Sequence, residues 1–98
     1  MKLFKKKEFT LEMGFSRKEF ISLLNNQNKL IYKRDENTIT FTLAGQNARI
    51  TLGQEGTRRV ASARLPMLIV NFDFSDMADL EQEQFMGVFL LKFHRGGG

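Results

Sequence analysis

The residue types that most often perform catalysis are sparse in this chain. Its 98 residues include one histidine, His94, and no cysteine, which removes thiolate nucleophiles and cysteine-based metal sites. A catalytic centre needs a nucleophile beside a base, paired carboxylates in a cleft, or a metal ion. His94 stands between Lys92 and Arg95, beside the glycine tail, a setting typical of a solvated residue at a helix end. We therefore expect a protein with no catalytic residues and no cofactor.

Two short runs have the composition of ion-binding loops. Oxygen-bearing side chains alternate along 71–76, as in a calcium loop, but the turn glycine is missing and Gln82 replaces the closing glutamate. The run 54–59 combines turn amides with Arg58 and Arg59, yet it lacks the glycine–lysine pattern of a phosphate loop. A strand end with a helix cap explains the first run better, and a hairpin turn flanked by solvated arginines is favoured for the second. We expect no metal site.

The basic residues support a nucleic-acid-binding alternative. The formal net charge is +4 and the pI is about 9.7, which permits an anionic partner. Basic residues crowd the start of the chain, and acidic residues crowd 73–83. Contacts to a nucleic-acid backbone would come from a basic N-terminal patch and sheet arginines, namely Lys5, Lys6, Lys7, Arg17, Lys18, Arg49, Arg58, Arg59 and Arg64. The predicted open sheet face carries no aromatic platform for base stacking, which weakens this alternative.

The elements that must position these residues begin with a strand and a capped helix. Apolar side chains alternate along 9–13, a period of two that predicts a strand with one buried face. Ser16 precedes Glu19 by three residues, the spacing of a capping box. We expect the helix to end near Asn26. Two phenylalanines occupy the positions of a hydrophobic staple, Phe15 and Phe20.

Strand signals separated by turn residues fill the middle of the chain. The short connections require antiparallel neighbours, with one apolar face and one face rich in threonine. The segment 53–56 has the composition of another turn, and Pro66 is expected to interrupt the strand that follows it. The predicted strands are Leu30–Arg34, Thr38–Leu43, Ala48–Leu52, 58–65 and 67–74.

A long acidic-capped helix is predicted from Ser75 or Asp76 onward. Its first turns hold several carboxylates, which favour the positive end of the helix dipole. Phe85, Phe89 and Phe93 recur every fourth residue, so this helix should lie across the apolar face of the sheet.

These elements predict one α+β domain over residues 1–95, followed by a flexible glycine tail over 96–98. We expect an antiparallel sheet of five to six strands in β-α-β-β-β-β-(β)-α order, with the long C-terminal helix packed across one face. This order resembles one repeat of the TATA-box-binding protein and also the helix-grip domains. Helix-grip domains wrap a sheet around a C-terminal helix to hold apolar ligands, so a carrier of a small apolar ligand is a further alternative.

The apolar stretches Leu65–Val70 and Phe85–Leu91 fall short of the ~20 residues that cross a bilayer. No apolar run of signal-peptide type follows the basic start. We therefore expect a cytoplasmic protein without a membrane span. The leading functional hypothesis is a small non-catalytic binding or protein-interaction domain, in which exposed sheet edges offer a route to self-association.

Overall fold

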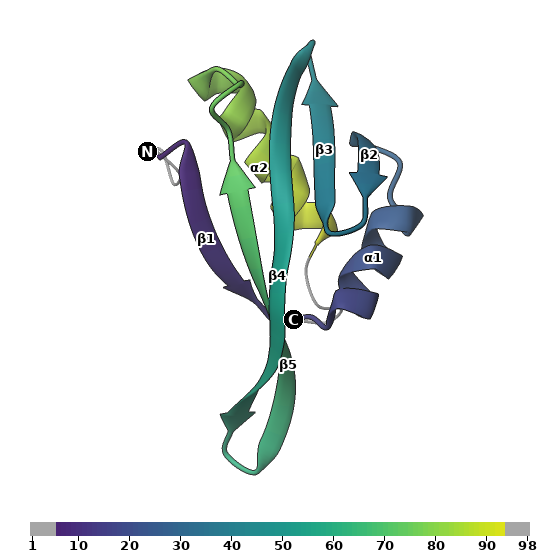
Figure 1. Ribbon diagram of the computed structural model, residues 1–98, viewed down its shortest axis with the longest axis vertical. Coiled ribbons are helices and arrows are strands. Elements are labelled where there is room, and N and C mark those ends of the chain that lie inside the picture. The colour runs from purple at the N-terminus through teal and green to yellow at the C-terminus, as the bar shows by residue number, and fades with distance from the viewer. Residues whose placement is uncertain (1–5, 94–98) are drawn as a thin grey trace.

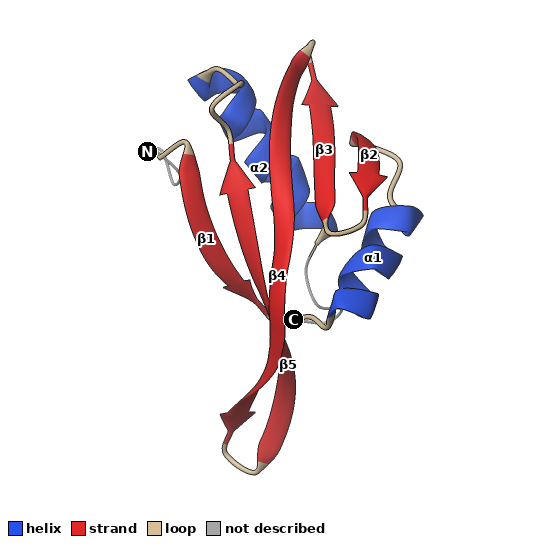
Figure 2. Cartoon of the chain, in the orientation of Figure 1, coloured by secondary structure: helices blue, strands red, loops and turns tan. Residues whose placement is uncertain are grey.

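Alternating apolar residues assemble into one antiparallel sheet, with both helices on the same side (Figures 1 and 2). The computed structural model describes residues 6–93. Lys5, His94, Arg95 and the predicted glycine tail at 96–98 lie outside the described residues.

The sheet has the strand order β1-β5-β4-β3-β2, and every neighbouring pair is antiparallel. This arrangement, with a helix at the C-terminal end lying across one face, confirms the predicted α+β fold. The elements are β1 (Glu8–Met13), α1 (Arg17–Asn26), β2 (Ile31–Asp35), β3 (Thr38–Leu43), β4 (Gln46–Val60), β5 (Ala63–Asp73) and α2 (Asp79–Lys92).

The start of α1 has the predicted capping box. The Glu19 amide donates to the Ser16 hydroxyl oxygen at 3.1 Å, and the Ser16 amide donates to the Glu19 carboxylate at 2.9 Å. The rings of Phe15 and Phe20 meet edge to face with centroids 6.3 Å apart, as a staple requires. These contacts fix the direction in which the chain turns from β1 into α1.

Replacing Ser16 by alanine is expected to lower the free energy of unfolding by about 1 kcal/mol, because the Glu19 amide loses its acceptor. Urea denaturation followed by circular dichroism measures this loss. Ser22→Ala is the matched control, since Ser22 is an exposed residue inside α1 and alanine favours a helix interior. Equal losses in the two variants would contradict a stabilising role for the cap.

The predicted turn at 53–56 is wrong, because β4 continues through it to Val60. The register between β4 and β5 shifts between Leu52 and Glu55, which marks a β-bulge that bends the strand without ending it. A Cβ on Gly53 would stand 3.1 Å from the backbone oxygen of Ile69, so glycine is needed where the two strands approach closely. The predicted strand over 58–65 is not one element, because its first residues belong to β4, which ends at Val60, and its last residues belong to β5, which begins at Ala63 and continues to Asp73.

The start of α2 was predicted three to four residues too early. The helix begins at Asp79, and Ala78 is its N-cap without a side-chain cap bond. The preceding residues remain in a turn because the Phe74 amide donates to the Lys7 carbonyl and the Met77 amide donates to the Phe74 carbonyl. The Asp73 carboxylate accepts from the Ser75 amide, which holds the same turn.

Candidate functional site

The most exposed part of the described chain is a two-stranded hairpin that projects from the sheet (Figure 1). The pairing of β3 with β4 stops at Thr51, and the pairing of β1 with β5 stops at Leu68. Beyond these points β4 and β5 pair only with each other, up to Val60 opposite Ala63. We call residues 55–67 the arm, and its residues 55–65 are all exposed.

The local sequence is compatible with the hairpin geometry of the arm. Ala61 and Ser62 make its tip, and Ala61 has a left-handed φ of 55°. Pro66 pairs with Thr57 at a level that β1 does not reach, so its missing amide donor removes no bond to a third strand. Pro66 thus lies within β5 and does not interrupt it, which corrects the prediction from sequence.

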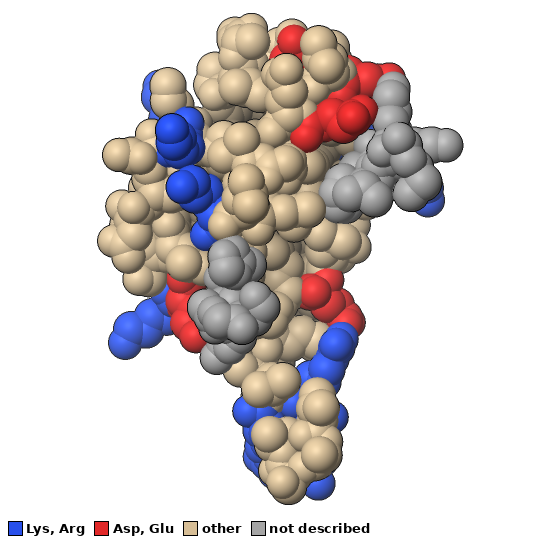
Figure 3. All heavy atoms as spheres, turned by 180° about the vertical axis from the view of Figure 1, so that it is seen from behind, with Lys and Arg blue, Asp and Glu red and all other residues tan. Residues whose placement is uncertain are grey.

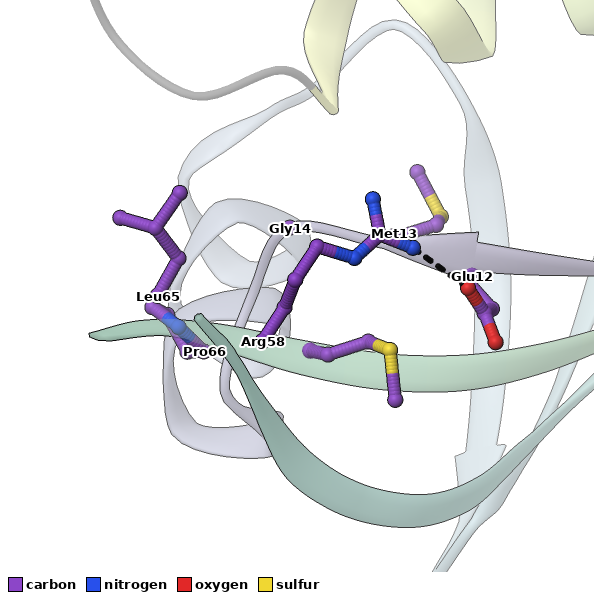
Figure 4. Close-up of a pocket in the computed structure, with 7 residues that line it drawn as sticks. Glu12, Met13, Gly14, Arg58, Leu65 and Pro66 are labelled. Atoms are coloured by element: carbon purple, nitrogen blue, oxygen red, sulfur yellow. Dashed lines mark hydrogen bonds and ion pairs between the residues drawn. The ribbon is translucent and has the colours of Figure 1, made fainter. Parts of the chain in front are cut away.

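The arm concentrates positive charge. Residues 56–67 contain three arginines and no carboxylate. Arg59 lies directly opposite Arg64, and like charges in this position repel each other. No ion pair engages either side chain among the residues that the structure describes. Arg58, which alternates with Arg59 and so points to the other side of the arm, lies 2.6 Å from the Glu12 carboxylate (Figure 4).

A shallow pocket of about 80 Å³ lies at the base of the arm. Figure 4 shows the Arg58–Glu12 ion pair at this pocket. The volume is well below the roughly 300–1,000 Å³ of sites that enclose a small-molecule ligand. Its lining residues are Glu12, Met13, Gly14, Arg58, Leu65, Pro66 and Met67.

Two of the predicted basic residues near the start of the chain form ion pairs with carboxylates. The Lys7 ammonium lies 2.9 Å from the Asp79 carboxylate, at the start of α2. The Arg17 guanidinium donates to the Gly53 carbonyl at 2.8 Å and lies 4.0 Å from the Glu55 carboxylate. The buried Nε of Arg17 has no hydrogen-bond partner within the described part of the chain. The fold therefore brings Lys7 against the acidic start of α2 and Arg17 against β4.

Arg49 lies on the open face of the sheet, directly opposite Asp73 on β5. Hydrogen bonds from the Ser75 hydroxyl and amide lower the pKa of Asp73, and the charge of Arg49 lowers it further. Both residues line an open polar hollow of about 240 Å³ together with Asn47, Ser75 and Asp76. Arg49 thus faces carboxylates and is poorly placed to attract a polyanion.

The eight predicted contact residues that lie within residues 6–93 do not form one continuous surface. Lys6 and Lys18 are exposed, but Lys6 lies near the start of β1 and Lys18 lies on α1. Figure 3 shows positive charge on the arm at the lower end and carboxylates near the start of α2 at the upper end. Three of the eight residues lie on the arm, where Arg59 and Arg64 are paired and Arg58 points to the other side.

The three arm arginines were predicted from the sequence, but the pairing of Arg59 with Arg64 was not. The segment predicted as one strand over 58–65 is the tip of a hairpin, and Arg59 and Arg64 are neighbours because the chain turns at Ala61. The sequence did carry one sign of a basic surface in this region, which is the absence of any acidic residue over 56–67.

The oxygen-bearing run at 71–76 is used within the fold. The Asn71 amide donates to the Thr10 hydroxyl at 3.1 Å, and the Asp73 carboxylate accepts from the Ser75 hydroxyl at 2.6 Å. Within residues 6–93, no group of three or more His, Asp or Glu side chains is placed to hold a metal ion.

Phenylalanine rings occupy the space between the sheet and α2. Phe89 stacks on Phe93 with centroids 4.4 Å apart and meets Phe72 edge to face at 5.3 Å. Phe85 meets Phe41 at 5.0 Å and Phe74 at 5.5 Å. All of these side chains are buried, and the contacts are those of a packed interior.

The fold and the arm define a small α+β protein that presents a basic two-stranded hairpin. Comparison of the chain with protein-family models, with curated proteins and with solved structures gives no match. Among the described residues, no helix has both the length and the apolar character needed to cross a membrane.

Proposed function

We propose that this protein is a non-catalytic nucleic-acid-binding domain that contacts the phosphate backbone through the arm. The observation that carries the proposal is the Arg59–Arg64 pair, two arginines directly opposite each other in the strand register and without an ion-pair partner in the described chain. Two adjacent like charges repel each other, and a bound phosphate relieves that repulsion. The pair therefore has a physical reason to bind an anion.

The shape of the arm is compatible with binding in the groove of a nucleic-acid duplex. A two-stranded ribbon fits the major groove of a duplex, which is ~12 Å wide. The six residue pairs from Glu55–Leu68 to Val60–Ala63 extend roughly 20 Å at ~3.3 Å per residue. With no exposed aromatic side chain on the arm for stacking, binding through phosphate contacts favours duplexes and is independent of base sequence.

The test is a fluorescence-anisotropy titration of a labelled 20-base-pair DNA duplex at several salt concentrations. We expect micromolar to 100-micromolar binding at low salt, because few phosphates are neutralised. Arg59→Ala/Arg64→Ala is expected to weaken binding about 10-fold or more and to reduce the slope of log K against log salt by ~2. Arg58→Ala should have a smaller effect, since Glu12 already neutralises that side chain.

Lys29→Ala/Lys33→Ala is the control of equal net charge. Both lysines are exposed and lie outside the arm. Lys33 lies on β2, an edge strand of the sheet that does not pair with β4 or β5. This control should keep most of the wild-type affinity and salt slope. Equal losses in the two double variants, or no binding by the wild type at low salt, would contradict a role for the arm. Cleavage of the duplex during the titration would contradict the non-catalytic part of the proposal.

The ring contacts between the sheet and α2 argue against the carrier alternative. An apolar ligand would have to displace side chains such as Phe72 and Phe89, whose rings already contact each other. Co-purification of a small apolar molecule, detected by native mass spectrometry, would favour the carrier instead.

A further inference from the structure

The arm leaves the sheet at the β-bulge in β4 (Figure 1). The paired positions on β4 advance from Leu52 to Glu55 while those on β5 advance by only two residues, so β4 carries one extra residue at this point. A bulge of this kind bends its strand and increases the local twist. The conformation of the bulge therefore sets the direction in which the arm projects.

Arg17 spans this bulge from the side of the sheet on which α1 lies. Its guanidinium donates to the Gly53 carbonyl at 2.8 Å and lies 4.0 Å from the Glu55 carboxylate. Its backbone amide, at the first residue of α1, donates to the same carboxylate at 2.9 Å. The first amides of a helix have no acceptor within the helix, so a carboxylate is favoured there. Arg17 thus joins the two residues that flank Gln54 in the bulge.

Glu12 contacts the arm from the opposite side of the sheet. Neighbouring side chains of a strand alternate between its two faces, and Met13 is buried in the core, so Glu12 points away from the helices. The Arg58 guanidinium donates to the Glu12 carboxylate at 2.6 Å (Figure 4). The arm is therefore joined to α1 on one side of the sheet and to β1 on the other.

We propose that Arg17 and Glu12 are positioning residues that fix the direction of the arm and so present Arg59 and Arg64 to an anion at a defined place. The inference rests on the proposed nucleic-acid-binding function. A fixed arm loses little conformational freedom on binding, whereas a mobile arm must be ordered first, which lowers the affinity. Arg17 acts through the bulge and Glu12 acts through Arg58, so neither has to contact the anion itself.

Backbone NMR relaxation of the full chain tests this positioning role without any nucleic acid. The amides of the arm are expected to have order parameters near the ~0.85 of rigid backbone in the wild type and to fall towards ~0.6 in Arg17→Ala and in Glu12→Ala. Lys18→Ala and Glu8→Ala are the matched controls, because each removes the same charge from an exposed residue of the same element, and both should keep the wild-type values. The order of β3 should stay unchanged in every variant, which separates a mobile arm from a destabilised fold. Unchanged order of the arm in Arg17→Ala or in Glu12→Ala would overturn the role of that residue, and a mobile arm in the wild type would overturn the proposal.

The titration of the DNA duplex adds a test in which charge and positioning predict opposite signs. Glu55→Ala removes a negative charge at the base of the arm, so charge alone would strengthen binding of the duplex. Loss of the contact with Arg17 should instead weaken binding about 3-fold, because the arm must then be ordered on binding. Glu83→Ala removes the same charge from an exposed residue of α2 and should bind at least as tightly as the wild type. Tighter binding by Glu55→Ala would overturn the positioning role of the Arg17 contact, whereas a wild type that does not bind would contradict the proposed function and leave the relaxation result to decide whether the arm is fixed.

Discussion

Phe89→Ala is expected to lower the free energy of unfolding by about 3–5 kcal/mol, a large part of the ~5–15 kcal/mol available to a small domain. Phe89 is fully buried, and its ring contacts those of Phe72, Phe85 and Phe93 at centroid distances of 5.3, 5.7 and 4.4 Å. Removing it opens a cavity where the sheet, α1 and α2 meet. Chemical denaturation measures the loss.

Two further variants complete this test. Phe89→Leu removes fewer carbon atoms and should lose less, so it remains measurable if the alanine variant fails to fold. Leu91→Ala changes an exposed residue of the same helix and should stay within ~0.5 kcal/mol of wild type in dilute protein. Similar losses in Phe89→Ala and Leu91→Ala would contradict the central position of Phe89 in the core.

Gln82→Ala is expected to cost about 2–3 kcal/mol, because Gln82 ties α2 to the start of β1. Its side chain is buried, with 2% exposed. Its amide nitrogen donates to the Lys6 carbonyl at 2.9 Å, and its amide oxygen accepts from the Lys7 ammonium at 3.1 Å. Alanine leaves the carbonyl without this donor and the ammonium with one fewer acceptor.

Gln84→Ala is the matched control, since Gln84 is exposed on the same helix. Its unfolding free energy should be nearly unchanged or slightly raised. Hydrogen exchange adds a local measurement, because the Phe74 amide donates to the Lys7 carbonyl and should exchange faster in Gln82→Ala. If Gln82→Ala and Gln84→Ala both lower the free energy of unfolding by a similarly small amount, the Gln82 side chain does not stabilise the attachment of β1 to α2.

Local signals predicted the elements that local chemistry determines. The three-residue spacing of Ser16 and Glu19 specifies a cap whose atoms all lie within one turn. The four-residue spacing of Phe85 and Phe89 predicts the inner face of α2 before any partner is known. The fold class followed from the order of these elements along the chain.

The arm and the Lys7 contacts could not be predicted because they depend on tertiary pairing. Gly53 and Gly56 resemble turn residues, but the first permits a close strand approach and the second lies within the arm. The true tip at Ala61 lacks the glycine or asparagine that marks most hairpin turns. Lys7 and Asp79 are separated by more than seventy residues, so sequence alone gave each a separate role.

The pairing of β1 with β5 has a consequence for synthesis on the ribosome. These strands are neighbours in the sheet, yet the 60 residues from Gly14 to Asp73 separate the end of β1 from the end of β5. At ~5–20 residues per second, translation of that segment takes roughly 3–12 s. The three-stranded meander β2-β3-β4 can form as soon as β4 has been made, whereas β1 still lacks its partner at that point. The alternating apolar residues of β1 thus stay unpaired in the nascent chain until β5 has been made.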